Sequence, residues 1–169
     1  MTPAERSLIM ALVMRPGGKE PLSDAEFLRE FPASDGVALG VTLLQDAVAR
    51  RDPVDVELAL IVCSTFGLSA DLVPILVQLA AANWHERHED VATALGTVGG
   101  GSPDAVEALV HLATWVPEYL EFDRARALAR KAVRSLGAMR SDAANQALEV
   151  LSTGESRTVA DAALAQLQR

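Results

Sequence analysis

Apolar residues recur along this chain at spacings of three and four, which is the spacing of one face of an α-helix. Two stretches show the pattern most clearly, and both end in Leu-Gly with apolar residues at the same relative positions: Val91, Ala92, Leu95, Gly96 and Ala132, Val133, Leu136, Gly137. Because glycine commonly closes helices, the pattern predicts two similar helices that stop at Gly96 and Gly137.

A repeated helix start organises most of the chain. Serine followed closely by an acidic residue caps a helix and complements its dipole. Four such starts follow one another at offsets of 35, 33 and 39 residues: Ser34-Asp35, Ser69-Ala70-Asp71, Ser102-Pro103-Asp104 and Ser141-Asp142. Each start predicts a helical hairpin, with the helices paired as 37–51 with 53–66, 72–82 with 85–95, 105–116 with 122–136, and 143–151 with 157–167.

The first part of the chain has a different pattern. Thr2-Pro3-Ala4-Glu5 and Ser23-Asp24-Ala25-Glu26 are capping boxes, which predict helices to Met14 and to Phe31, the second ended by Pro32. We therefore expect residues 1–33 to form an N-terminal helical cap. Residues 34–169 then form the repeat domain, and the two parts together make a single compact unit.

The repeat pattern resembles the HEAT-repeat family. The stretches RHEDVATALGTVGGGSPDAVEALVHL and ARKAVRSLGAMRSDAANQALEVL are similar to the second helix of one HEAT unit followed by the first helix of the next. A hairpin of this size cannot bury its apolar face alone, so successive hairpins must stack. The sequence thus predicts an all-α fold, a right-handed α-α superhelix of about four HEAT-like hairpins with an N-terminal cap. WHERHED, EYLEFD and ALARK also resemble a group of uncharacterised bacterial HEAT proteins, a resemblance that implies no activity.

The composition limits the cellular location and the kinds of reactive site that we expect for this chain. Cys63 is the only cysteine, which excludes a disulfide framework and fits a reducing, cytoplasmic location, and its apolar neighbours indicate a buried side chain. The apolar run near residue 8 is too short to span a membrane and lacks a cleavage site, so we expect neither a signal peptide nor a membrane segment. No catalytic triad, phosphate loop or cofactor motif can be assembled, and we expect no cofactor.

The charge is unevenly distributed. The whole chain has a net charge of −8, yet residues 124–140 contain no acidic residue and six basic ones: Arg124, Arg126, Arg130, Lys131, Arg134 and Arg140. On the predicted helix the first five of these cations lie away from the apolar face, and Arg140 follows just beyond the helix. They either pair with acidic helices of the neighbouring units or bind a partner. The HEAT resemblance implies that second helices line a concave surface, which makes this basic face the candidate partner-binding site.

A second candidate is a polar cluster between repeats: Trp84, His85, His88, Glu89, Tyr119 and Asp123. With a helix over 85–95, both histidines face the neighbouring unit, and we interpret them as packing residues with imidazoles bonded to a carboxylate or carbonyl. The alternative is a metal site of His85, His88 and Glu89, because this segment resembles the His-Glu motif of deoxyhypusine hydroxylases, HEAT-repeat di-iron enzymes. That family needs His-Glu pairs from several repeats, which are absent here, so we expect no metal site.

The leading hypothesis from sequence is a non-enzymatic HEAT-repeat adaptor that binds a protein. An acidic solenoid of this size also suits an immunity-type inhibitor of a basic toxin. Nucleic acid is the third alternative, since alkylpurine DNA glycosylases of HEAT-like fold use a basic face with tryptophans. Both tryptophans here, however, sit at expected helix positions where core packing is the more common explanation. One basic helix on an acidic body disfavours that alternative.

Overall fold

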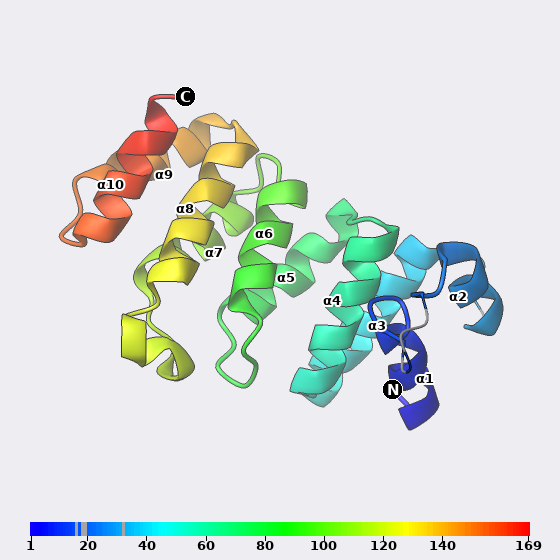
Figure 1. The fold of residues 1–169 in the computed structure, drawn as a ribbon. Coiled ribbons are helices and arrows are strands. Elements are labelled where there is room, and N and C mark those ends of the chain that lie inside the picture. Colours follow the sequence, from blue (N-terminus) through cyan, green and yellow to red (C-terminus); the bar gives the residue numbers. More distant parts are fainter. Residues whose placement is uncertain (16, 18–19, 32) are drawn as a thin grey trace. The chain divides into compact units, whose positions relative to one another are not determined.

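The computed structural model describes residues 1–15, 17, 20–31 and 33–169, and over these ranges the chain is helical without any strand. Pro32, expected to end a helix, lies outside them. Figure 1 shows the order of the helices: α1 (Pro3–Met10), α2 (Asp24–Glu30), α3 (Gly36–Arg50), α4 (Pro53–Phe66), η2 (Ala70–Leu72), α5 (Val73–Ala80), α6 (His88–Val98), α7 (Pro103–Thr114), η3 (Glu118–Asp123), α8 (Arg126–Met139), α9 (Asp142–Ser152) and α10 (Arg157–Leu167). The prediction of an all-α chain is confirmed.

The chain divides into two compact units, Met1–Ser69 and Ala70–Arg169. The expected cap over 1–33 is therefore not a unit of its own. The reason is a set of ion pairs that attaches α1 to α4. Arg6 Nε lies 2.8 Å from Asp55 Oδ1, and Arg6 Nη2 lies 2.6 Å from Asp52 Oδ2. These pairs place α1 in the same unit as the α3–α4 hairpin.

Asp55 is the buried charge of the first unit. Its side chain is fully buried and also accepts hydrogen bonds from the Met1 amino group and from Arg50. Burial opposes ionisation, but the hydrogen bonds from the Met1 amino group and from Arg6 outweigh it and lower the pKa of Asp55. The same unit buries Cys63, where burial raises the pKa of the thiol to about 11, so this cysteine is a packing residue as expected.

The second unit consists of three stacked helical hairpins, α5–α6, α7–α8 and α9–α10. The second helices contact one another in sequence, α6 with α8 and α8 with α10, and the first helices contact one another in the same way, α5 with α7 and α7 with α9. Figure 1 shows the resulting two layers. Between them lie fully buried apolar side chains, including Leu95, Leu112 and Leu136.

Two glycines set the spacing within the layer of second helices. A Cβ atom at Gly96 would come within 2.6 Å of Ser135 Cβ and 2.9 Å of Ser135 Cα on α8. One at Gly137 would come within 3.0 Å of Gln166 Cγ and 3.1 Å of Gln166 Cβ on α10. The prediction that Gly96 and Gly137 end their helices is wrong. Both glycines lie inside a helix, which continues to Val98 or to Met139, and both allow the next second helix to approach closely.

Most predicted caps are confirmed. Thr2 and Ser23 form capping boxes, and Ser102 and Ser141 accept hydrogen bonds from the backbone of α7 and α9. Asp52 caps α4 in the same way. Asp35, rather than Ser34, caps α3. The predicted start of α5 is less regular, because a 3₁₀ turn precedes the helix and Leu72 provides no side-chain cap.

Two predicted helix starts are wrong in a way that affects the candidate sites. The helix expected from residue 85 begins at His88, so His85 lies in the connection that precedes α6. The helix expected from residue 122 is divided, because Arg124 and Ala125 adopt left-handed conformations with φ of 58° and 51°. Glu118, Glu121 and Asp123 therefore belong to η3 and do not lie at the start of α8.

Substitution of Gly96 tests the close contact between α6 and α8. We expect Gly96→Val to lower the unfolding free energy of the second unit by about 2–3 kcal/mol, because the new side chain meets the backbone of Ser135. Urea unfolding followed by tryptophan fluorescence measures the effect on this unit, since both tryptophans, Trp84 and Trp115, lie in it.

Gly101→Val is the matched control, because a Cβ atom at Gly101 has no neighbour within 4 Å. The control should change the unfolding free energy by less than about 0.5 kcal/mol. Equal effects of the two substitutions would contradict close packing at Gly96.

Candidate functional site

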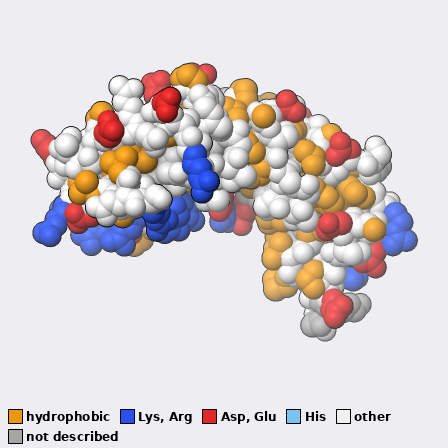
Figure 2. Space-filling model, turned by 90° about the horizontal axis from the view of Figure 1, so that it is seen from above, with side chains coloured by type: hydrophobic (Ala, Val, Ile, Leu, Met, Phe, Trp, Pro, Cys, Tyr) orange, Lys and Arg blue, Asp and Glu red, His pale blue; other side chains and the backbone are white. Residues whose placement is uncertain are grey.

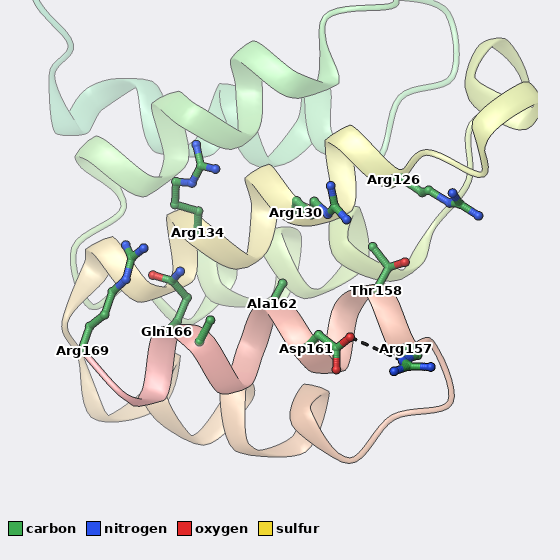
Figure 3. A pocket seen from close by; sticks show the side chains of 10 residues that line it. Arg126, Arg130, Arg134, Arg157, Thr158, Asp161, Ala162, Gln166 and Arg169 are labelled. Atoms are coloured by element: carbon green, nitrogen blue, oxygen red, sulfur yellow. Dashed lines mark ion pairs between the residues drawn. The ribbon is translucent and has the colours of Figure 1, made fainter.

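The strongest concentration of positive charge lies between α8 and α10. Arg126, Arg130 and Arg134 follow one another at intervals of four residues, so they share one face of α8. Arg157 at the start of α10 and Arg169 just after its end line the same surface. Figure 2 shows the basic side chains gathered over these two helices at its lower left, and Figure 3 shows the individual residues. We call this surface the arginine groove; it has a volume of about 470 Å³ and is lined by Arg126, Arg130, Arg134, Arg157, Thr158, Asp161, Ala162, Ala165, Gln166 and Arg169.

The groove has little internal charge compensation. Asp161 is its only lining carboxylate among the described residues, and it pairs with Arg157 at 3.6 Å across one helical turn, with both side chains largely exposed. Figure 3 marks this pair, and Arg126, Arg130 and Arg134 make no ion pair with any described residue. The three guanidinium groups therefore repel one another without a neighbouring carboxylate to offset the repulsion.

The other cations of the basic segment behave differently. Lys131 does not line the groove but pairs with Glu89 on α6, with 2.9 Å between Nζ and Oε2. Internal pairing, one of the two alternatives left by the sequence, thus applies to Lys131. Arg124 and Arg140 are exposed, but they lie outside the helix in left-handed turns and do not line the groove. The expectation that Arg124 belongs to the helical row is wrong, because the chain turns sharply at Arg124 and Ala125 before α8 begins.

The described lining residues of the groove are suited to binding anions. A guanidinium group donates paired hydrogen bonds that match the two oxygens of a carboxylate or phosphate. Apart from the arginines and Asp161, the polar groups that line the groove are the Thr158 hydroxyl and the Gln166 amide. These groups suit recognition and positioning rather than proton transfer or nucleophilic attack.

The second predicted site, the polar cluster, is largely brought together. His88 is fully buried; its Nε2 lies 2.7 Å from Ala82 O and its Nδ1 lies 3.0 Å from the Tyr119 hydroxyl. Since a carbonyl only accepts, Nε2 carries the proton, and Nδ1 accepts from Tyr119. His85 repeats this arrangement, donating from Nε2 to Leu79 O and accepting the Arg87 N–H at Nδ1. Burial lowers the pKa of both histidines, that of His88 to about 4, so both are neutral.

This geometry does not provide the metal site that the sequence left as an alternative. The ring nitrogens of His85 and His88 are fully engaged, and the Glu89 carboxylate pairs with Lys131. Over the described ranges, no group of three or more His, Cys, Asp or Glu side chains is arranged to hold a metal ion. The imidazole-to-carbonyl bonds expected for packing residues are confirmed.

The cluster also differs from the sequence prediction in its members. Trp115 belongs to it and forms a T-shaped contact with His88 at a centroid distance of 5.0 Å. Both tryptophans lie in the connections between helices, half-buried, and not at helix positions as expected. Asp123 forms no hydrogen bond with the cluster through its buried Oδ1, which has no hydrogen-bond partner in the described part of the chain.

No family model, curated protein or solved structure matches this chain. Among the described residues, no helix combines the length and the apolar character needed to cross a membrane. Function must therefore be inferred from the sites themselves.

The buried state of His88 predicts a dependence of stability on pH. Its pKa is lower in the folded unit than the ordinary value of 6.5, so protonation favours the unfolded chain, and stability is lost as the pH falls from 6.5 towards about 4. Between about pH 7.5 and about pH 5, this residue should lower the unfolding free energy by about 2 kcal/mol.

His88→Gln provides the comparison, since glutamine is uncharged at both pH values and can still donate to Ala82 O. The unfolding free energy of the variant should fall by about 2 kcal/mol less than that of the wild type over this range, as measured by urea unfolding with tryptophan fluorescence. Identical pH dependence in the two proteins would show that His88 does not titrate on unfolding in this range.

Proposed function

We propose that this chain is a non-enzymatic protein-interaction module of the HEAT-like α-solenoid type, and that the arginine groove binds an acidic segment of a partner protein. One observation carries the proposal: Arg126, Arg130 and Arg134 lie along one face of α8 without a carboxylate partner among the described residues. The two layers of stacked hairpins in residues 70–169 support a solenoid architecture, in which second helices offer an extended binding surface.

The spacing of the arginines favours a peptide ligand. Residues four apart on a helix are separated by about 6 Å along its axis. Acidic side chains four residues apart on a partner helix, or two residues apart on an extended strand, repeat at about the same distance. Each carboxylate of such a segment can then meet one guanidinium group, which removes the repulsion among the arginines.

A nucleic acid is a weaker candidate for the same groove. A protein that binds a nucleic acid neutralises the phosphates with several well-spread cations. The affinity therefore depends on the charge of the whole protein surface. Residues 35–123 of this chain contain fourteen acidic and three basic residues, so most of the chain repels a duplex. An acidic protein segment needs only the local positive charge of the groove.

Charge reversal in the groove tests the proposal. We expect Arg130→Glu combined with Arg134→Glu to weaken the binding of a fluorescein-labelled polyglutamate peptide at least about tenfold, since two attractive contacts become repulsive. Fluorescence anisotropy at low salt measures the binding, and added salt should weaken it in the wild type.

The matched control is Arg29→Glu combined with Arg51→Glu, which changes the net charge equally at exposed positions outside the groove. This control should retain wild-type affinity within about twofold. A short DNA duplex is the second ligand, and tighter binding of the duplex than of the peptide would favour the nucleic-acid alternative. Equal loss in both double variants would show that the peptide responds to net charge and not to the groove.

A further inference from the structure

A second pocket lies at one end of the unit formed by residues 70–169, where the α5–α6 connection meets η3. Tyr119 on η3 bonds to His88 at the start of α6, so the two connections lie side by side (Figure 1). The pocket has a volume of about 760 Å³, within the range of small-molecule sites. Its lining includes Trp84, Trp115 and Tyr119, which are both tryptophans and the single tyrosine of the chain.

Each of these three aromatic rings is held by a buried imidazole. Trp84 forms a T-shaped contact with His85 at a centroid distance of 5.3 Å, and Trp115 forms one with His88 at 5.0 Å. Tyr119 stacks on His88 at 5.7 Å, and the two imidazoles stack on each other at 4.2 Å. The three rings are half-buried, so they remain accessible to a ligand, and their contacts fix them in place before any ligand arrives.

The charged residues that line the pocket are all acidic. Glu86, Glu118 and Glu121 line it and are exposed, and none of them pairs with a cation in the described part of the chain. No lysine or arginine is among the described lining residues, and the two histidines are neutral because burial lowers the pKa of each and Nδ1 of each accepts a hydrogen bond. The pocket therefore combines aromatic rings with three carboxylates.

We infer that this pocket binds an organic cation, either an alkylammonium or a guanidinium group. A cation is attracted by the electron-rich face of tryptophan or tyrosine, and most strongly when the site is partly desolvated. The three glutamates add a long-range attraction and exclude anions from the pocket. The ligand is either a free quaternary amine or a lysine or arginine side chain of a protein, and the two share this chemistry. The inference does not depend on the proposed role of the arginine groove.

Tryptophan fluorescence tests the inference directly, because both tryptophans of the chain line this pocket. The probes are choline, Nα-acetyl-lysine amide and Nα-acetyl-arginine amide. The comparison ligand is 3,3-dimethyl-1-butanol, which has the shape of choline but no charge. We expect a saturable fluorescence change with a cation and at least about fivefold weaker binding of the alcohol. Binding of choline alone identifies a free amine as the ligand, and binding of the amino-acid amides identifies a protein side chain.

A charge-neutralised variant separates binding in the pocket from general attraction to an acidic protein. Glu86→Gln, Glu118→Gln and Glu121→Gln combined should weaken cation binding about tenfold, while these exposed substitutions leave the unit folded. The control combines Glu107→Gln, Glu149→Gln and Glu155→Gln, which are exposed and lie outside the pocket, and it should retain wild-type affinity. Equal affinity for choline and the alcohol, equal loss in both triple variants, or no saturable change with any cation at millimolar concentration would overturn the inference.

Discussion

The second unit of this protein depends on the close approach of successive second helices at two glycines. Gly96 brings α6 onto Ser135 of α8, and Gly137 brings α8 onto Gln166 of α10. Glycine inside a helix costs about 1 kcal/mol relative to alanine, so its presence at two equivalent positions indicates that packing offsets the loss. Because the three helices lie so close together, the side chains on their outer faces form one surface in which residues of different hairpins act together.

The two candidate sites follow from this arrangement and differ in charge. Stacking α8 beside α10 brings arginines of both helices around one groove, and stacking α6 beside α8 lets Glu89 neutralise Lys131 but leaves the groove arginines without a carboxylate partner among the described residues. At the end of the unit, the same stacking places Tyr119 over His88 and assembles the aromatic pocket with its glutamates. The charge asymmetry of the sequence thus becomes two binding surfaces of opposite sign on one unit.

The sequence predicted the helices and their caps well, because apolar periodicity and capping boxes are local signals. It failed where tertiary contacts decide the outcome. The Leu-Gly pairs have the pattern of helix stops. The glycines are required instead because a neighbouring helix packs against each of them, and a local pattern does not reveal that contact. The left-handed residues Arg124 and Ala125 carry no sequence signal, since arginine and alanine rarely adopt that conformation, and so the predicted helix includes the end of η3 together with α8. For the groove, Arg126, Arg130 and Arg134 were found from their spacing, but Arg157 and Arg169 were missed because only helix packing places α10 beside α8.

A double-mutant cycle at Gly96 and Ser135 tests the central claim most directly. Gly96→Ala places a Cβ atom against Ser135, and Ser135→Gly removes the side chain that it meets. If α6 and α8 touch at this point, the double variant should be more stable than the sum of the single changes predicts, with a coupling of at least about 1 kcal/mol in the unfolding free energy. Additive effects, within about 0.3 kcal/mol, would show that the two residues are not in contact and would contradict the account.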